Sequence, residues 1–457
     1  MKIIQVLILI ILVHPYVLNA QVTEEGNKKQ AKKQLYLADT IWRITPNNDF
    51  NKEESDYSFK RMVQGDNIAI FWHKEFGDNP TELTNERKRF DPQLALKECE
   101  RFYTFYVDTL KLIKKGNSIT DKYKMVLFVI NGDGGTAFGG GTGKVGMLWT
   151  PAARMNKPPY GALAHELGHS FQYVSSIDNG GGPRGSIGEM SAQYMLWQVY
   201  PEWMTFENYH LVDFLKGTHY AFLHGYNTYH SPYVFEYWSN KRGKEFYGEF
   251  CRNTKQGEDP VATYKRITFQ SQEQFNDEMF DASRRFITWD LPRIDQVARK
   301  YANQHFTTIN PIGDDWFVIA KEKCPQNYGY NGIKLKVPKA GTKITVNFKG
   351  IAGSEGFSKV NLDRAGWRYG FLASKKDGSR VYGEVHNDTE GIAKFKVPKN
   401  TEYLWLVVMG APTEHWPIAA RRRTADASTA PPVVEEQWPY QIKLKGTSPD
   451  ETMIKKK

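Results

Sequence analysis

The first part of the chain alternates between two patterns of apolar and polar residues. Residues 67–72 (NIAIFW) and 125–130 (MVLFVI) are short, nearly continuous apolar runs, which predict strands. Between them, residues 94–113 carry apolar side chains at helical spacing. A strand, a helix and a second strand in this order predict a mixed α+β start to the fold.

A glycine-rich stretch at residues 132–144 (GDGGTAFGGGTGK) follows the second strand. A phosphate-binding loop here would need Gly at position 138 and Ser or Thr at position 145, but the chain has Phe138 and Val145. The stretch is therefore interpreted as a turn. Residues 145–150 (VGMLWT) predict one more short strand before the next helix.

The pattern becomes mostly helical in the middle of the chain, at 189–200, at 233–241 and in a segment that ends near Phe286. It changes to alternation after Pro325. Residues 333–337 and 344–348 alternate apolar with polar positions on either side of a turn, and predict a hairpin with one buried face.

Further alternating segments lie at 367–372, 392–397, 403–409 and 438–444. Short strands separated by Gly, Pro and Asn turns are typical of a β-sandwich. The predicted fold class is therefore α+β: a small mixed sheet with a helical part at 56–325, a β-sandwich at 326–446 and a basic tail at 447–457.

The N-terminal residues predict export. Residues 1–20 contain Lys2, an apolar run from Ile3 to Val13 and a small residue, Ala20, as signal peptides do, with an uncleaved anchor as the alternative. Residues 21–55 are predicted to be a flexible leader. No second long apolar run follows, so no membrane span is expected in the mature chain, and we expect a secreted, periplasmic or cell-surface protein.

Composition and charge narrow the class of partner. Of the 457 residues, 40% are hydrophobic and 25% charged, as in ordinary globular proteins. The net charge is +10, but the basic residues are spread out apart from small clusters at 421–423 and 455–457. No nucleic-acid-binding motif accompanies them, so a nucleic-acid partner is not expected. The three cysteines, Cys99, Cys251 and Cys324, form no disulfide framework and are interpreted as buried thiols.

The strongest chemical signal is His165-Glu166-Leu167-Gly168-His169 within GALAHELGHSFQYV. On a helix, His165 and His169 share one face, so both imidazoles can reach one metal ion. Glu166 lies about 100° round the helix, where it can hold a water molecule instead of the metal. This spacing serves zinc hydrolysis, although it also arises by chance in a helix.

A hydrolytic zinc site keeps three protein ligands and one open position. Glu189 is the candidate for the third ligand. It lies twenty residues after His169, at the start of the next predicted helix, and the glycine-rich stretch SSIDNGGGPRGSIG between them can turn the chain back.

These motifs together resemble the gluzincin metallopeptidases, whose thermolysin-like members bind zinc through HExxH and a later Glu. More narrowly, the chain resembles a family of secreted bacterial proteins of unknown function, sometimes labelled avirulence proteins. The resemblance implies a Zn2+-dependent peptidase-like core followed by a β-sandwich, and it supplies no substrate. It covers roughly residues 60–446 and rests on VGMLWTPAA, GALAHELGHSFQ, GEMSAQY, ITWDL, YGYNGIKLKVPKAG, AGWRYGF and EEQWPYQIKL.

One position departs from the gluzincin pattern. The family places Asp four residues after the glutamate ligand, where it orients the first histidine, and this chain has Gln193. A carboxylate in that place raises the basicity of the ligand, whereas an amide only orients it. The departure leaves open either a weaker enzyme or an inactive scaffold.

The resemblance also implies a His or Tyr that donates a hydrogen bond to the oxyanion. The favoured residues are His230 and Tyr229, with packed aromatic residues as the alternative. The same segment also offers His219, His224, Tyr226 and Tyr233. Gluzincins further lay the substrate backbone along an edge strand, and residues 145–150 are either that strand or an internal one.

Two functions are carried forward. In the first, a secreted zinc metalloendopeptidase cleaves a protein or glycoprotein: His165, His169 and Glu189 bind zinc, Glu166 is the general base, and His230 stabilises the oxyanion. In the second, an inactive peptidase scaffold binds a glycan or a protein through its β-sandwich. Trp367, Tyr369 and Trp405 are then either a sugar platform or, as their apolar neighbours favour, part of the core.

Overall fold

The computed structural model describes residues 32–183, 186–417 and 434–455. The predicted signal peptide, the first part of the predicted leader and the basic cluster at 421–423 lie outside the described residues. Helices and strands are both abundant, so the predicted mixed α and β class is confirmed. None of the helices in the described part of the chain combines the length and apolar character needed to cross a membrane.

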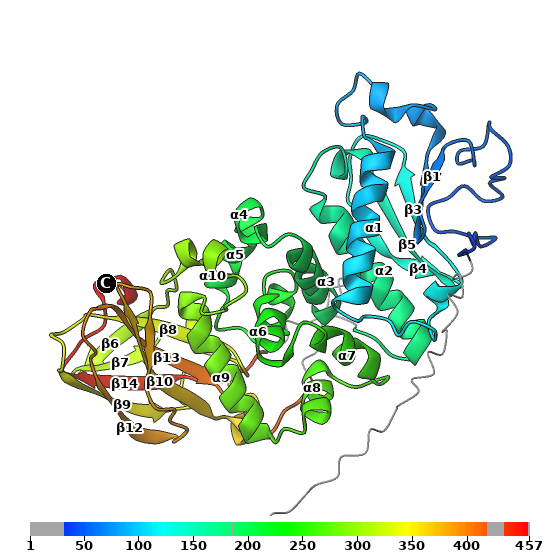
Figure 1. Ribbon diagram of the computed structural model, residues 1–457. Helices are drawn as coiled ribbons and strands as arrows, with labels where there is room; N and C mark the ends of the chain where they lie inside the picture. The colour runs from blue at the N-terminus through cyan, green and yellow to red at the C-terminus, as the bar shows by residue number, and fades with distance from the viewer. Residues whose placement is uncertain (1–31, 184–185, 418–433, 456–457) are drawn as a thin grey trace, which may run out of the picture. The chain divides into compact units, whose positions relative to one another are not determined.

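A five-stranded sheet forms the N-terminal part, in the order β1-β2-β3-β5-β4 (Figure 1). The central strands β2, β3 and β5 run parallel, and the two edge strands β1 and β4 are antiparallel to their neighbours. Every residue of the central strands is buried, which explains their continuous apolar runs. The strands are β1 (Met62–Gln64), β2 (Ile68–Trp72), β3 (Met125–Ile130), β4 (Phe138–Thr142) and β5 (Val145–Pro151).

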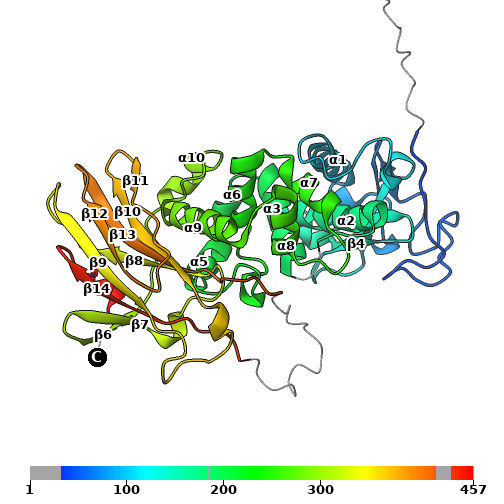
Figure 2. The same ribbon diagram turned by 90° about the horizontal axis from the view of Figure 1, so that it is seen from below.

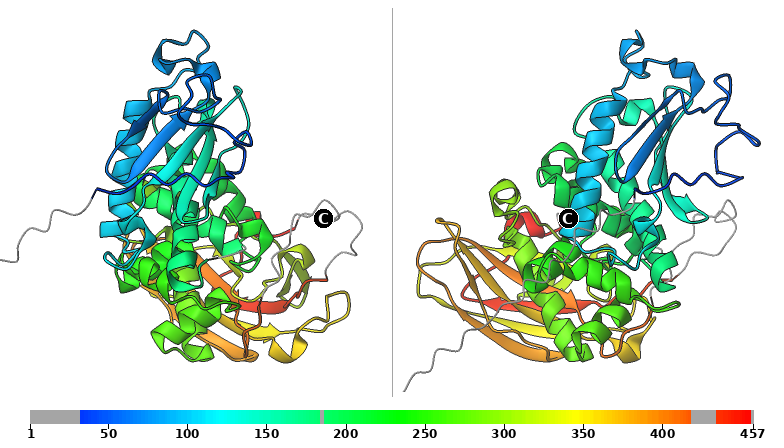
Figure 3. Two further views of the ribbon diagram at one scale, coloured as in Figure 1. Left: turned by 90° about the vertical axis from the view of Figure 1, so that its right-hand side faces the viewer. Right: turned by 45° about the vertical axis from the view of Figure 1, so that its right-hand side comes forward.

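Different segments cover the two faces of this sheet. Helices α1 (Pro92–Asp108) and α2 (Gly161–Asn179) share a core with alternate sheet residues such as Ile70 and Leu127. The opposite face packs against residues 35–57, where Ile41 and Tyr57 are buried, and Figure 3 shows this dark blue segment across the sheet from α1. The predicted leader at 21–55 is therefore wrong from about residue 35 onward, because an apolar sheet buried on both faces needs this cover.

Helices α3 to α10 follow and form the middle of the described chain (Figure 1). Local sequence explains several of their starts. Asp91 and Asp259 accept backbone N–H groups at the N-termini of α1 and α8, and each precedes a proline in the first turn. The helices are α3 (Ser186–Val199), α4 (Trp203–Phe206), α5 (Asn208–Lys216), α6 (Tyr233–Arg242), α7 (Phe246–Asn253), α8 (Pro260–Thr268), α9 (Gln272–Thr288) and α10 (Asp295–Ala298).

The C-terminal part contains two antiparallel sheets that share one hydrophobic core. We call it the two-sheet region, residues 309–417 and 434–455. The first sheet has the order β11-β10-β13-β8, from β8 (Tyr330–Leu335), β10 (Trp367–Lys375), β11 (Arg380–Tyr382) and β13 (Thr401–Gly410). The second has the order β12-β9-β14-β7-β6, from β6 (Ile309–Gly313), β7 (Trp316–Ile319), β9 (Lys343–Gly350), β12 (Glu390–Lys396) and β14 (Tyr440–Lys445).

The limits of this region differ from the prediction. Strands β6 and β7 precede residue 325 and belong to the second sheet. At the other end, Met453 is buried and Ile454 pairs with Ile309, so the predicted tail at 447–457 is part of the fold as far as Lys455. The predicted segments 333–337 and 344–348 correspond to strand β8, which ends at Leu335, and to strand β9, but the two strands do not form the predicted hairpin. β8 pairs with β13 and β9 with β12 and β14, because the chain crosses between the sheets.

Strand β13 is buried on both faces. Leu404, Leu406 and Val408 point into the core between the two sheets, whereas Trp405 and Val407 belong to the core shared with the helices. Figure 2 shows α9 lying along β10 and β13. Trp367 and Tyr369 are also buried between the sheets. The core interpretation of Trp367, Tyr369 and Trp405 is therefore confirmed, and none of the three can form an exposed sugar platform.

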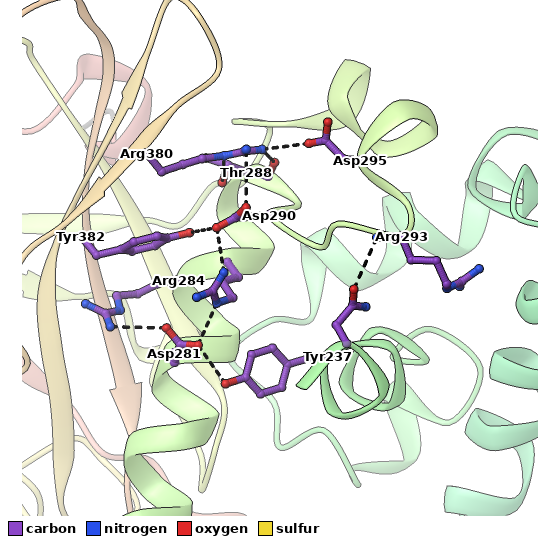
Figure 4. Close-up of polar contacts among 11 residues, drawn as sticks. Tyr237, Asp281, Arg284, Thr288, Asp290, Arg293, Asp295, Arg380 and Tyr382 are labelled. Atoms are coloured by element: carbon purple, nitrogen blue, oxygen red, sulfur yellow. Dashed lines mark hydrogen bonds and ion pairs between the residues drawn. The ribbon is translucent and has the colours of Figure 1, made fainter. Parts of the chain in front are cut away.

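Polar contacts hold the two-sheet region against the helices (Figure 4). Arg380 of β11 forms ion pairs with Asp290 at 3.5 Å and Asp295 at 3.3 Å. The hydroxyl of Tyr382 donates to Asp290 at 2.7 Å, and Arg285 of α9 donates to the same carboxylate at 2.9 Å. These contacts reinforce the apolar core that the helices share with β8, β10 and β13.

Candidate metal centre

The HELGH motif lies in the first half of α2. Its apolar neighbours Leu163, Leu167 and Phe171 are buried in the core, as the sequence pattern predicts. The helix ends at Asn179, and Gly180 follows in the left-handed conformation with φ 72°, a frequent way for a helix to stop. The glycine-rich stretch after it turns the chain towards α3.

Helix α3 runs antiparallel to α2, as three side-chain contacts show. His165 contacts Gln193, His169 contacts Glu189, and Gln172 donates to the carbonyl of Gly188 at 2.8 Å. Residues that come later in α2 thus contact residues that come earlier in α3. Glu189 and Gln193, four residues apart on α3, face the two histidines.

Three ligand atoms converge between these helices. Oε2 of Glu189 lies 3.1 Å from Nε2 of His165 and 3.0 Å from Nε2 of His169. The two Nε2 atoms are 3.1 Å apart. Ligand atoms on a tetrahedral zinc ion are separated by about 3.4 Å, given metal–ligand distances near 2.1 Å. The two nitrogens and one oxygen therefore fit a zinc site with three protein ligands.

Glu166 is close to this set but has another environment. It lies with His165 and His169 in a group whose ligand atoms are all within 4.8 Å of one another. Its carboxylate accepts a hydrogen bond from the backbone N–H of Gly139 on β4, while Glu189 alone contacts both Nε2 atoms. Glu189 is therefore placed to act as a third ligand, whereas Glu166 is placed to act on water.

Each histidine presents its other ring nitrogen to a glutamine. Nδ1 of His165 lies 3.0 Å from Oε1 of Gln193, and Nδ1 of His169 lies 3.0 Å from Oε1 of Gln172. An amide oxygen only accepts, so both Nδ1 atoms carry a proton. With Nε2 protonated as well, each histidine donates to Glu189, and a metal would replace these Nε2 protons and take the lone pairs. The gluzincins have an aspartate in this place, and Gln193 can orient His165 without the negative charge of that aspartate.

Burial and charge shift the pKa values of this site. Burial raises the pKa of Glu166, and the charges of His165 and His169 offset only part of that effect. For Glu189, burial acts in the same direction, but the hydrogen bonds from both histidines outweigh it and lower its pKa. Burial opposes protonation of His169, yet the contact with Glu189 raises its pKa above the ordinary value. The carboxylate of Glu189 is therefore ionised, as a ligand must be.

A cleft of about 1170 Å3 opens from Glu189 towards the two-sheet region. Tyr229 and His230, from the loop before α6, line the end near the histidines. Gln326, Phe357 and Glu435 of the two-sheet region line the other end. Both parts of the chain therefore contribute to the space in which a substrate would lie.

The candidates for oxyanion stabilisation occupy different places. The ring of Tyr229 stacks near that of His165, with 6.3 Å between centroids and 24° between planes. His230 lines the cleft, and its Nδ1 lies 2.9 Å from Nδ1 of His210. Tyr233 is fully buried in the core, and His224 is engaged with Glu435 at 2.8 Å. Tyr229 and His230 are thus the two candidates that the structure brings to the metal end of the cleft.

The edge strand next to α2 is β4, not residues 145–150. Strand β5 lies between β3 and β4 and is internal. The predicted glycine-rich turn at 132–144 contains β4, whose glycines let the strand approach α2 closely. A Cβ atom on Gly139 would lie 2.1 Å from the carbonyl oxygen of Glu166.

Sequence reasoning missed two residues near the candidate metal site. Gln172 lies three positions after His169 on the same helix, so the helical spacing alone could have identified it. His210 contacts Gln193 from α5, with 2.8 Å between Nε2 atoms, and no local pattern predicts that contact.

Residues 27–451 match a protein family of unknown function, DUF6055, and the chain therefore belongs to this family. No curated protein matches the chain.

Proposed function

We propose that the protein is a secreted zinc-dependent endopeptidase of the gluzincin type. The observation that carries this proposal is the convergence of Glu189 with His165 and His169, each at 3.0–3.1 Å. The proposed architecture is a gluzincin-like core followed by a β-sandwich. Secretion is inferred from residues 1–20.

A zinc ion at this position supplies Lewis acidity, which lowers the pKa of water and polarises a carbonyl group. Glu166 takes a proton from the attacking water and passes it to the leaving amine. Its raised pKa suits both steps, because a carboxylate that titrates nearer neutrality is the stronger base and is readily protonated. Tyr229 or His230 donates a hydrogen bond to the oxygen of the attacked carbonyl.

The free edge of β4 is the proposed place for the substrate backbone. Strand β4 pairs with β5 on one side only and packs on α2 beside Glu166. An extended peptide can add to such an edge through main-chain hydrogen bonds. The volume of the cleft favours a protein or glycoprotein substrate over a small molecule, since it exceeds the roughly 300–1000 Å3 of common small-ligand pockets.

The alternative, an inactive scaffold that binds a glycan or protein, has less support. The sequence feature in its favour is Gln193 in place of an aspartate, but Gln193 presents its oxygen to His165, as an orienting acceptor does. The three aromatic residues offered as a sugar platform are buried.

Glu166→Gln tests the proposal. We expect the variant to bind zinc as the wild type does and to lose turnover of a peptide library by about 100-fold or more, the usual contribution of a general base. Glu202→Gln, at an exposed position, is the matched control and should keep full turnover. Cleavage by Glu166→Gln at the wild-type rate would refute the mechanism.

A further inference from the structure

A chain of four polar side chains connects the metal site to the cleft. Nδ1 of His165 contacts Oε1 of Gln193 at 3.0 Å, and Nε2 of Gln193 contacts Nε2 of His210 at 2.8 Å. Nδ1 of His210 then contacts Nδ1 of His230 at 2.9 Å. These contacts use both nitrogens of His210 and the Nδ1 of His230, a residue that lines the cleft, and they do not involve its Nε2.

Each hydrogen bond in this chain fixes the direction of the next. The amide nitrogen of Gln193 donates, so Nε2 of His210 accepts and the proton of His210 is on Nδ1. That proton is donated to His230, whose own proton must then be on Nε2. In this order, His165 carries its proton on Nδ1 and His230 presents an N–H donor to the cleft.

The hydrogen bonds can also run in the opposite direction, with every donor still matched to an acceptor. If the amide of Gln193 is turned over, its nitrogen donates to His165, which then carries its proton on Nε2 and cannot bind a metal. His210 donates from Nε2 to the amide oxygen, and His230 donates from Nδ1 and presents a bare Nε2 to the cleft. Without metal this order is favourable, because Nε2–H of His165 can donate to Glu189.

We propose that His210 is a positioning residue that couples metal binding at His165 to the hydrogen-bonding character of His230. Metal binding requires the first order, so it turns His230 into a donor facing the substrate. The inference rests on the proposed metal site and adds a regulation that the site alone does not imply.

The surroundings of His210 suit this role. Its ring is 6% exposed and stacks on Trp203, with 5.1 Å between centroids. Burial lowers its pKa to about 3, so the ring is neutral and has one donor and one acceptor. Oε2 of Glu207 lies 3.8 Å from Nε2 of His210, beyond hydrogen-bonding distance, and does not compete with Gln193.

The coupling also gives a reason for glutamine at position 193. A carboxylate there would accept protons from His165 and His210 alike. His210 would then carry its proton on Nε2, and His230 would lose its donor towards the cleft. Only an amide, with one acceptor and one donor side, transmits the order from one histidine to the other.

A double-mutant cycle on zinc affinity tests the role of His210. His210→Phe keeps the stacking on Trp203 and removes both nitrogens. We expect it to weaken zinc binding about tenfold, as loss of partners behind a ligand usually does. In the Gln193→Glu background, both side-chain oxygens of residue 193 are acceptors, so His210 is not needed to turn one of them towards His165. There the same change should alter the dissociation constant of zinc by less than about threefold. Equal loss in both backgrounds would mean that His210 acts through packing, and would overturn the inference.

Nitrogen-15 NMR of the histidine rings tests the coupling in the wild-type protein. The His230 signals are identified by their loss in His230→Gln. We expect the proton of His230 to be on Nε2 with zinc bound and on Nδ1 after zinc removal. The same tautomer in both states would overturn the inference while leaving the zinc site intact. A wild-type protein that binds no zinc would overturn the proposed function and the coupling with it.

Discussion

The carboxylate of Glu189 lies 3.0 Å from Nε2 of His169, although the two residues belong to different helices and are separated by a glycine-rich stretch. The same oxygen lies 3.1 Å from His165. The contact fixes the register between α2 and α3, and the proposed metal ligands are thus held by the packing of two long helices rather than by loops. Such support is typical of sites that must keep a fixed ligand geometry.

Glu189→Ala should abolish zinc binding. The protein should bind one zinc ion per chain, and the variant should bind none after dialysis, because two histidines alone lack the third ligand of a stable site. Atomic absorption on the dialysed proteins measures this. The exposed Glu202→Ala should keep its metal.

Thermal unfolding gives an independent measurement of the same site. Zinc at about 100 times its dissociation constant should stabilise the wild type by about 2.7 kcal/mol, since it binds the folded state only. The melting temperature of Glu189→Ala should not respond to zinc. A stabilisation by zinc that persists in this variant would exclude Glu189 as a ligand.

Gln172→Met should weaken zinc binding by about tenfold, because His169 loses the acceptor that keeps its proton on Nδ1. The side chain of Gln172 also binds Gly188 and Ser191, so some loss of stability is expected as well. Gln198→Met is the control: Gln198 is buried on the same helix as Glu189 but donates to Glu236. It should lower stability and leave the dissociation constant of zinc unchanged. Equal zinc affinities of the two variants would contradict the assignment.

Gly139→Ala should impair both stability and turnover. The added Cβ would meet the carbonyl oxygen of Glu166 at 2.1 Å, so β4 must move away from α2. We expect a loss of about 1–3 kcal/mol, typical of overpacking, and slower peptide cleavage because the N–H of Gly139 no longer reaches Glu166. Gly140→Ala places its Cβ in open space and should leave stability unchanged. Chemical unfolding and peptide turnover measure the two effects, and wild-type behaviour of Gly139→Ala would show that β4 does not need this close approach.

The sequence predicts those parts of the site that depend on spacing along one helix. His165, Glu166 and His169 follow from such spacing, and Glu189 follows from a glycine-rich turn between two helices. The structure brings these residues together. His210 could not be found in this way, since its contact with Gln193 arises from the packing of α5 against α3.

The same limit applies to the fold. The continuous apolar run of β3 and the alternation of β9 identify these strands, because burial on two faces or on one leaves a direct mark on the sequence. The pairing of the strands leaves no such mark on the sequence. Strands β8 and β9 are adjacent in sequence and lie in different sheets, so the predicted hairpin failed. Strand β4 was missed because three of its five residues are glycine, which has low strand propensity.

Helix α8 offers a test of pH-dependent stability away from the metal. Arg266 donates to the carboxylate of Glu258 from Nε at 2.7 Å and from Nη2 at 2.5 Å, and Thr263 donates at 2.8 Å. These hydrogen bonds lower the pKa of Glu258 to about 2, the one from Arg266 having the largest effect. The folded state therefore favours the ionised form of Glu258 more strongly than the unfolded state does.

Glu258→Gln should lower the free energy of unfolding by about 1 kcal/mol at pH 7, within the range for partly exposed ion pairs. Because the folded pKa is depressed, the stabilisation is fully present above the unfolded value of 4.5 and is lost as the pH falls towards about 2. The wild type and the variant should therefore become equally stable near pH 2. Urea unfolding at a series of pH values measures the difference, with Glu249→Gln at an exposed position of α7 as the control. A difference between the wild type and Glu258→Gln that stays constant from pH 7 to pH 2 would show that the hydrogen bonds of Glu258 do not depend on its charge.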